Sequence, residues 1–190
     1  MATLMYDGRK LNWIENGEIK HCFAATSGLS EEVSGTRNYQ HSKFQCCPNV
    51  GPIPEGTYVL RLEFNRQPVA QVADPETCRL QAATGIEQIP DADPEQGTEH
   101  CTPYWQNWGY NRVRIDAYDT KAKQACGGHR SGFYIHDSHK GYTHGCIEAQ
   151  HEFFNHLYDF VNSNPKKKLM LLGVDYGKGS VTRGKTKRPR

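Results

Sequence analysis

A cysteine and a histidine ten residues apart are the side chains best suited to chemistry in this sequence. Cys146 stands in the run Thr143-His144-Gly145-Cys146-Ile147, and His136 ends a short strand-like run. A thiolate is a nucleophile that needs an imidazole as its base, and a pair of backbone N–H groups can stabilise the oxyanion that forms. Gly145 permits a tight turn that brings such N–H groups close to a ligand. The spacing predicts nucleophilic catalysis by Cys146 with His136 as the base.

The cysteine count also points to one reactive thiol. The chain has seven cysteines, and disulfides take them in pairs, so we expect six paired cysteines and one free one. No two are spaced Cys-x-x-Cys, which argues against a zinc ribbon or a thioredoxin motif. Cys46 and Cys47 are neighbours, and a bond between them would strain the backbone. Disulfides persist in oxidising compartments, which predicts a place of action outside a cytoplasm. The alternative is seven reduced cysteines buried as small apolar groups.

Length and composition bound the class of protein. The chain has 190 residues, 36% hydrophobic and 11% aromatic, with a mean hydropathy of -0.77. The aromatic content argues against disorder, and no apolar run approaches the ~20 residues that span a bilayer. The first residues lack a basic region followed by an apolar stretch, so we expect neither a membrane span nor a Sec-type signal peptide.

Charge is distributed unevenly along the chain. Residues 166–190 hold nine Lys or Arg against a single acid, Asp175, while the rest of the chain is mildly acidic. We expect one domain over residues 1–176 and a basic, flexible tail over 177–190. The tail is either a solvated terminus or an anchor on an anionic polymer. A nucleic-acid partner is not expected, because the main body lacks basic character.

The elements that must position Cys146 are mainly strands. Asn16-Gly17 lies between two strand-like runs and predicts a hairpin, and further strands are predicted at 57–62, 112–118, 132–136 and 168–172. Residues 28–50 and 65–110 are expected to form long loops. Apolar residues at helical spacing predict one helix, about 148–162, ended by Pro165. That helix would begin just after Cys146, so its dipole would favour the thiolate.

Several of these motifs occur in one order that resembles a known family. Gly51-Pro52-Ile53-Pro54-Glu55-Gly56-Thr57-Tyr58, then His136, then Thr143-His144-Gly145-Cys146-Ile147 resemble the L,D-transpeptidase (YkuD-type) catalytic domain. A Tyr6-to-Trp13 strand and a Ser27-Gly28 turn are similar to the branch of type VI secretion effectors, the L,D-transpeptidase/carboxypeptidase toxins. The resemblance covers roughly residues 4 to 175.

The resemblance implies a mainly β fold, a β-sandwich or barrel with long disulfide-stapled loops and the single helix. It implies an enzyme without cofactor or metal that acts on peptidoglycan stem tetrapeptides, as L,D-carboxypeptidase, L,D-transpeptidase or both. Cys146 would be the nucleophile, His136 its base and His144 a neighbour in the motif. Type VI delivery implies action in the periplasm of a target bacterium, secretion by a non-Sec route and a cognate immunity protein.

The substrate-binding residues expected beside these are Gly145, Thr143, Asp137 and Arg130. Asp137 follows the base and either orients the imidazole or only makes a turn. Many family members have an Arg after the motif's Ile, placed to meet a substrate carboxylate, and here that residue is Glu148. Arg130, Lys140 or Arg112 could replace it, and the sequence does not choose among them.

Three other functions compete with this interpretation. A zinc peptidase could use His136, His139 and His144 with Asp137, although the chain has no His-Glu-x-x-His motif. A papain-like cell-wall peptidase would place its Cys before its His in the chain, and the order here is the reverse. A non-catalytic, disulfide-stapled cell-wall-binding module with a basic tail is the third.

Overall fold

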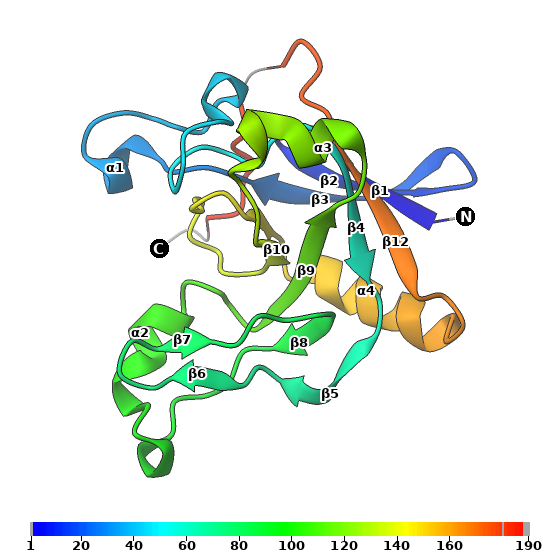
Figure 1. Cartoon of the computed structure of the whole chain (residues 1–190). Helices are drawn as coiled ribbons and strands as arrows, with labels where there is room; N and C mark the ends of the chain where they lie inside the picture. The colour runs from blue at the N-terminus through cyan, green and yellow to red at the C-terminus, as the bar shows by residue number, and fades with distance from the viewer. Residues whose placement is uncertain (1, 180, 188–190) are drawn as a thin grey trace.

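Eight strands of the computed structural model, which describes residues 2–179 and 181–187, close into a barrel (Figure 1). The first and the last of these eight strands pair antiparallel with each other, which closes the barrel. Around the barrel the strands are β10 (Phe133–His136), β11 (Ile147–Ala149), β3 (Glu18–Thr26), β2 (Lys10–Glu15), β1 (Ala2–Tyr6), β12 (Leu169–Val174), β4 (Gly56–Arg61) and β9 (Asn111–Ala117). The expected mainly β fold is confirmed.

A small lobe, residues 64–110, continues the sheet beyond β9 and lies below the barrel in Figure 1. It contains β5 (Phe64–Val69), β6 (Val72–Asp74), β7 (Arg79–Leu80), β8 (Ile86–Gln88), η2 (Pro94–Gln96), η3 (Glu99–Cys101) and α2 (Thr102–Trp105). The remaining helices are α1 (Glu31–Ser34), η1 (Ser42–Phe44), α3 (Thr120–Gln124), η4 (Ala125–Gly128) and α4 (Glu152–Ser163). No helix among the described residues has the length and apolar character needed to cross a membrane.

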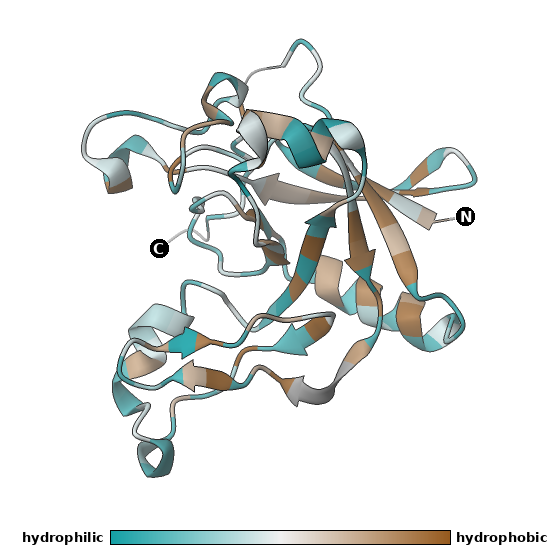
Figure 2. Ribbon diagram, viewed as in Figure 1, coloured by the Kyte–Doolittle hydropathy of each residue, from teal (hydrophilic) through white to brown (hydrophobic). Residues whose placement is uncertain are grey.

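The main core fills the barrel and continues onto α4. Alternate residues of the strands point inward, and Figure 2 shows apolar residues recurring along β4, β9 and β12. Helix α4 adds Phe153, Phe154, Leu157 and Val161, the apolar stripe that the sequence predicts. Full burial of such a side chain stabilises the fold by about 1.5–3 kcal/mol. The core therefore fixes the strands on which Cys146 and His136 lie.

Local sequence signals account for most of these elements. Asn16 and Gly17 have φ of 52° and 83°, the left-handed pair that a type I′ hairpin between β2 and β3 requires. The four further predicted strands are present as β4, β9, β10 and β12. The predicted helix is displaced, because residues 147–149 form strand β11 and α4 begins only at Glu152. The expected effect of a helix dipole on Cys146 is therefore wrong.

The disulfides differ from the expected three. The structure has two, Cys46–Cys126 and Cys78–Cys101, and three free cysteines, Cys22, Cys47 and Cys146. Cys22 is exposed on β3, where no other described cysteine is placed to bond with it. Cys46 and Cys47 are not bonded to each other, as expected, and Cys146 is free.

Residues 181–187 lie against β3, where the sequence predicts a flexible tail. Thr182 and Thr186 are buried, and backbone bridges join Arg183 to Thr26 and Val181 to His41. The Thr182 hydroxyl donates to the Ser27 carbonyl at 2.7 Å, and the Ser27 N–H donates to the Thr182 carbonyl at 2.8 Å. Composition alone does not predict this docking, because the contacts are made by the threonines that lie between the basic residues. Residues 180 and 188–190 lie outside the described residues.

We predict that Thr182→Val lowers the free energy of unfolding by about 1–3 kcal/mol, since it leaves the buried Ser27 carbonyl without that donor. Denaturant unfolding measures the change. Thr36→Val, an exposed loop position, is the matched control and should change little. Equal stability of both variants and the wild type would show that residues 181–187 do not dock in solution.

Candidate active site

The register of β10 and β11 places Cys146 and His136 on one face of the sheet. The two strands are parallel, with Ile135 opposite Ile147 and His136 opposite Glu148. Successive side chains of a strand alternate between faces, so Ile135 and Ile147 enter the core while His136 and Glu148 point outward. One residue before β11, Cys146 lies opposite Tyr134 on that outer face. Cys146 is therefore diagonal to His136 across the two strands.

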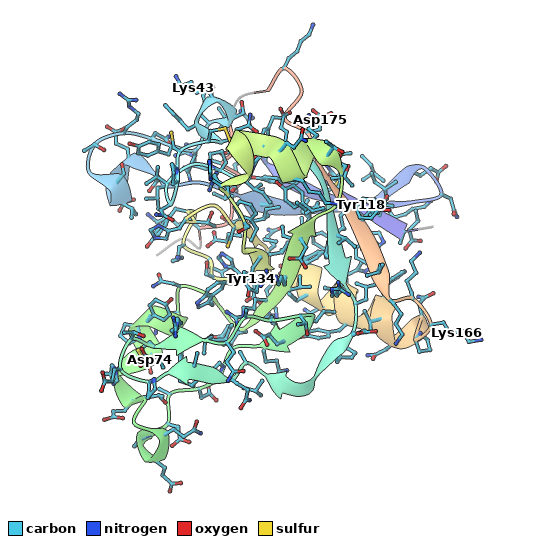
Figure 3. All side chains as sticks on the ribbon, in the orientation of Figure 1. Lys43, Asp74, Tyr118, Tyr134, Lys166 and Asp175 are labelled. Carbon is cyan, nitrogen blue, oxygen red and sulfur yellow. A yellow bond between two sulfur atoms is a disulfide. The ribbon has the colours of Figure 1, made fainter. Side chains whose placement is uncertain are left out.

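The small lobe covers this outer face, so the site is enclosed. Figure 3 shows Tyr134 between the barrel and the lobe that carries Asp74. The Trp108 ring lies 5.3 Å from Tyr134 and 5.6 Å from His136, centroid to centroid. The Tyr134 hydroxyl accepts the Ala83 N–H at 3.2 Å. Every residue of β10 is consequently buried, although the strand alternates between core and site.

His136 is held as a neutral imidazole. Burial, together with the charges of Lys140 and Arg112, lowers its pKa from 6.5 to about 3, against a hydrogen bond to the Trp108 backbone that raises it. Its Nδ1 is buried and has no hydrogen-bond partner among the described residues. A neutral ring that uses one nitrogen and leaves the other unpaired has a lone pair able to accept a proton.

The Cys146 thiol is half-buried and protonated at rest. Burial raises its pKa, and a Tyr134 backbone hydrogen bond and the charges of Lys140, Arg112 and Arg130 lower it. The cations thus favour the thiolate once a proton leaves, while burial prevents free ionisation. The resting site therefore holds a thiol and a neutral imidazole.

The turn that carries Cys146 is fixed by the Ser27-Gly28 turn. The Thr143 hydroxyl donates to the Cys146 carbonyl at 2.6 Å and accepts the Gly28 and Gly145 N–H groups, each at 3.1 Å. The Ser27 hydroxyl donates to the Gly145 carbonyl at 3.3 Å. Gly145 has a φ of 121°, and a Cβ there would clash with the Arg130 guanidinium. Thr143 and Gly145 therefore shape the turn.

Two buried carboxylates hold the connection between His136 and Cys146. Asp137 Oδ1 accepts the Tyr110 and Asn111 N–H groups at 2.7 and 2.8 Å, and Oδ2 accepts the Asn111 amide and His151 Nδ1 at 2.9 and 2.7 Å. Glu148 accepts the Lys140 and Gly141 N–H groups, each at 2.7 Å, and the Ser138 hydroxyl. Asp137 follows His136 in the chain, so its four hydrogen bonds to the protein also hold the backbone of the base in place.

The three cations weighed as substitutes for the missing arginine all lie near the thiol, but their partners differ. Arg112 is buried in an ion pair with Glu87. Arg130 donates to the backbone carbonyls of Gln45, Gly51 and Pro52. Lys140 makes no ion pair among the described residues, although the charge of Glu148 acts on it, and its ammonium lies 4.4 Å from the centre of the Tyr142 ring. Burial lowers the pKa of Lys140 from 10.5 to about 8. Lys140 is thus the cation with capacity for a ligand.

A cleft of about 810 Å³ opens beside these groups, between the small lobe and the connection after His136. The lobe contributes residues 89–92 and much of 102–110, including the aromatic rings of Trp105 and Tyr110. The barrel side contributes Asp137, Ser138, His139 and Lys140. The cleft has the size of a ligand site, and Lys140 is one of its lining residues.

His144 stands apart from the buried pair. Its side chain is exposed, and Nδ1 lies 2.9 Å from the Asn49 carbonyl. The roles predicted for Cys146, His136, His144 and the four substrate-binding residues stay predictions. Sequence reasoning missed two structural roles here, the Glu148 carboxylate that holds the loop and the Glu87 partner of Arg112. The available signals were Arg112, a charged residue inside a predicted strand, and Glu148, which stands where many family members have an arginine.

The fold and this face define a class: a closed eight-stranded barrel with a free thiol and a neutral imidazole on one covered outer face. The chain belongs to the Tlde1 domain family, whose model matches residues 30–172. This is a family of L,D-transpeptidase-like type VI secretion effectors with cell-wall activity, which implies secretion into target cells. A search of curated proteins gives no significant match.

We predict that Asp137→Asn lowers the free energy of unfolding by about 2–4 kcal/mol, because the new NH₂ group replaces one carboxylate oxygen and faces the two donors bonded to it, so that two hydrogen bonds are lost. Thermal or denaturant unfolding measures it. Asp159→Asn, exposed on α4, is the matched control. If Asp137→Asn changed only the KM for a substrate and left stability intact, the anchoring role would be refuted in favour of substrate contact.

Proposed function

We propose that the chain is a peptidoglycan-modifying cysteine enzyme that acts on the L,D bond of stem tetrapeptides. The observation that carries the proposal is the shared face of Cys146 and His136, where His136 Nδ1 has no hydrogen-bond partner among the described residues. Asp137, the next residue, lines the cleft. Family membership supports the substrate, because these effectors have cell-wall activity. The enzyme would act in the periplasm of a target bacterium, and its producer would need an immunity protein.

The proposed chemistry begins with proton transfer. His136 Nδ1 takes the thiol proton while the Cys146 sulfur attacks the carbonyl carbon of the third stem residue, a diamino acid linked to D-Ala. The C–N bond then breaks, the D-Ala nitrogen takes the proton from His136, and a thioester remains on Cys146. Water resolves the thioester in a carboxypeptidase, and an amine or free D-amino acid resolves it in a transpeptidase.

The cations support two stages of this reaction. Lys140, Arg112 and Arg130 act on the thiol through their charge, so the same groups stabilise the thiolate and the oxyanion that follows it. Lys140 alone has capacity for a ligand and lines the cleft, so we assign it the carboxylate of the terminal D-Ala. In this role it replaces the arginine that many family members carry at the position of Glu148.

The zinc alternative finds less support in the arrangement of the histidines. His136 is buried, His144 is exposed and bonded to Asn49, and His139 lines the cleft. These three do not form a ligand group among the described residues. The papain-like alternative fails on chain order. The binding-module alternative offers no account of a buried histidine with an unpaired nitrogen beside a free thiol.

Cys146→Ala and His136→Gln should each lower turnover of tetrapeptide muropeptides at least 10³-fold, because one removes the nucleophile and the other the base. Mass spectrometry reads loss of D-Ala, or its exchange for an added D-amino acid. Cys22→Ala, which removes an exposed free thiol on β3, is the matched control and should keep full activity.

Each alternative predicts a different outcome in the same assay. Chelator-sensitive cleavage that survives Cys146→Ala would establish a zinc enzyme. Wall binding or toxicity that Cys146→Ala leaves intact, without any turnover, would establish a binding module. Chelator-resistant loss of D-Ala that requires both residues supports the cysteine enzyme.

The KM for tetrapeptide should rise as the pH passes about 8. The pKa of Lys140 is lowered to about 8, so the ammonium is charged below that pH and neutral above it, where carboxylate binding is lost. His136 stays neutral down to a pH of about 3, so its protonation does not limit the rate between pH 5 and 8. Steady-state kinetics across pH 5 to 10 measure both effects.

Lys140→Gln should raise KM about 10–100-fold at pH 7 and remove its alkaline rise. Lys123→Gln, an exposed lysine on α3, should match the wild type. A KM in Lys140→Gln that equals that of the wild type at pH 7 would assign the D-Ala carboxylate to another group.

A further inference from the structure

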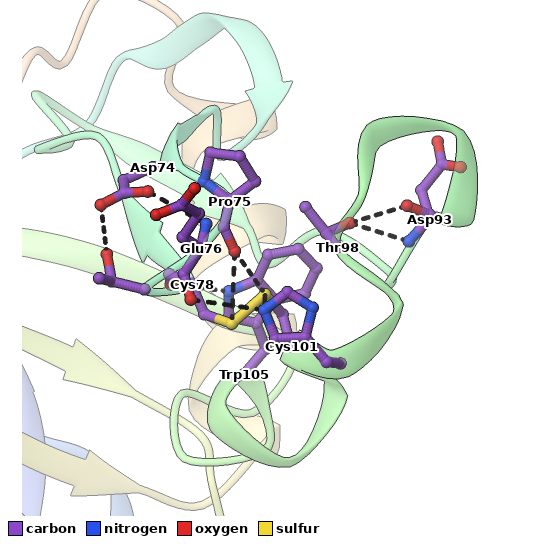
Figure 4. Close-up of a disulfide and its surroundings, with 10 residues drawn as sticks. Asp74, Pro75, Glu76, Cys78, Asp93, Thr98, Cys101 and Trp105 are labelled. Carbon is purple, nitrogen blue, oxygen red and sulfur yellow. Dashed lines mark hydrogen bonds between the residues drawn. A yellow bond between two sulfur atoms is a disulfide. The ribbon is translucent and has the colours of Figure 1, made fainter.

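The small lobe has a hydrophobic core of its own, and a disulfide links two segments of the lobe within it (Figure 4). The Cys78–Cys101 bond crosses this core, whose buried members are Ala70, Cys78, Leu80, Cys101 and Trp105. Trp105 Nε1 donates to the Cys78 carbonyl at 3.1 Å, which ties the two segments together beside the bond. A core this small depends on a cross-link for much of its stability.

A histidine lies against this disulfide on its solvent side. His100 Nε2 is 3.8 Å from Cys101 Sγ and 3.4 Å from the Glu76 carbonyl, and its side chain is exposed. One ligand atom from each of Cys78, His100 and Cys101 lies within 4.8 Å of the other two. The Pro75 carbonyl oxygen is 3.5 Å from Cys101 Sγ. Among the described residues, this is the sole group of three with such spacing.

The spacing matches a zinc site once the disulfide is open. Tetrahedral zinc with Zn–S and Zn–N bonds of about 2.3 and 2.0 Å holds its ligand atoms about 3.3–3.8 Å apart. The sulfur-to-nitrogen distance from Cys101 to His100 already has that value. Reduction frees the two sulfurs, which must then separate to about 3.8 Å to fit a tetrahedral site. The exposed His100 ring leaves a fourth position open to water.

We propose that Cys78, Cys101 and His100 bind Zn²⁺ when the lobe is reduced, and that oxidation to the disulfide expels the ion. A thiol reductant supplies two electrons and two protons to open the disulfide. Zn²⁺ then binds both sulfurs and the His100 nitrogen, and the two thiol protons leave. In the reverse direction a disulfide-donating oxidant accepts the two electrons of the thiolates, the S–S bond forms, and zinc departs to water.

Such a site would keep the lobe cross-linked in both redox environments. Disulfides do not persist in a reducing cytoplasm, where the chain is made, yet this lobe forms one wall of the cleft. Zinc would hold the lobe before secretion, and the disulfide would hold it afterwards. This use of the site rests on the proposed periplasmic action, whereas metal binding itself does not.

The test is a titration of the reduced full-length chain with Co²⁺, followed by displacement with Zn²⁺, under anaerobic conditions. Thiolate-to-cobalt charge-transfer absorption reports sulfur ligands directly and needs no assay of activity. We expect one equivalent bound to the reduced wild type and none to the oxidised protein. Cys46→Ser with Cys126→Ser removes the other disulfide and is the matched control, which should bind like the wild type.

Cys78→Ser with Cys101→Ser should abolish the absorption, and His100→Ala should weaken binding at least tenfold. The His100→Ala variant keeps its disulfide, so its folding can be verified in the oxidised state before reduction. Failure of the reduced wild type to bind, binding that survives loss of Cys78 and Cys101, or unchanged affinity in His100→Ala would each overturn the proposal. None of these results would bear on Cys146 catalysis.

Discussion

The parallel pairing of β10 with β11 is the constraint on which the site depends. Parallel neighbours normally need a crossover of about a dozen or more residues, usually a helix. Here residues 137–146 make the connection without a helix, and the return places Cys146 diagonal to His136. So short a path leaves backbone N–H groups without ladder partners, and Glu148 accepts those of Lys140 and Gly141. Asp137, at the start of the path, accepts the N–H groups of Tyr110 and Asn111 and so ties the path to the segment beside it. The geometry of the pair is thus inseparable from two buried acids.

Burial and charge act on the pair in opposite directions. The small lobe removes water from the outer face, which keeps His136 neutral and Cys146 protonated. Three cations nearby favour the negative charge that appears on sulfur and then on oxygen during attack. Two of the cations are bonded to the protein, which fixes their positions, and Lys140 is left for a ligand. The lobe is therefore as much a part of the site as the barrel.

Local patterns predicted the parts of this structure that depend on near neighbours. The Asn16-Gly17 hairpin, the strands and the glycine turn before Cys146 all express short-range backbone preferences. The sequence does not predict strand β11, because three residues next to an apolar helical pattern are too few to show the alternation of a strand. The disulfide partners and the docking of residues 181–187 depend on segments that are distant in the sequence. The number of cysteines does not identify which of them form disulfides. Glu148 looked like a departure from a motif, and its burial shows it to be a support.

The position of residues 181–187 has a consequence for how the molecule is made. This segment bonds to Ser27, and Ser27 in turn bonds to the turn that presents Cys146. Residues more than 150 positions apart must therefore meet before the nucleophile has its setting. A nascent chain still attached to its ribosome, with residue 187 inside the exit tunnel, carries the thiol without its support. Synthesis itself thus delays assembly of the reactive turn until residues 181–187 have left the ribosome.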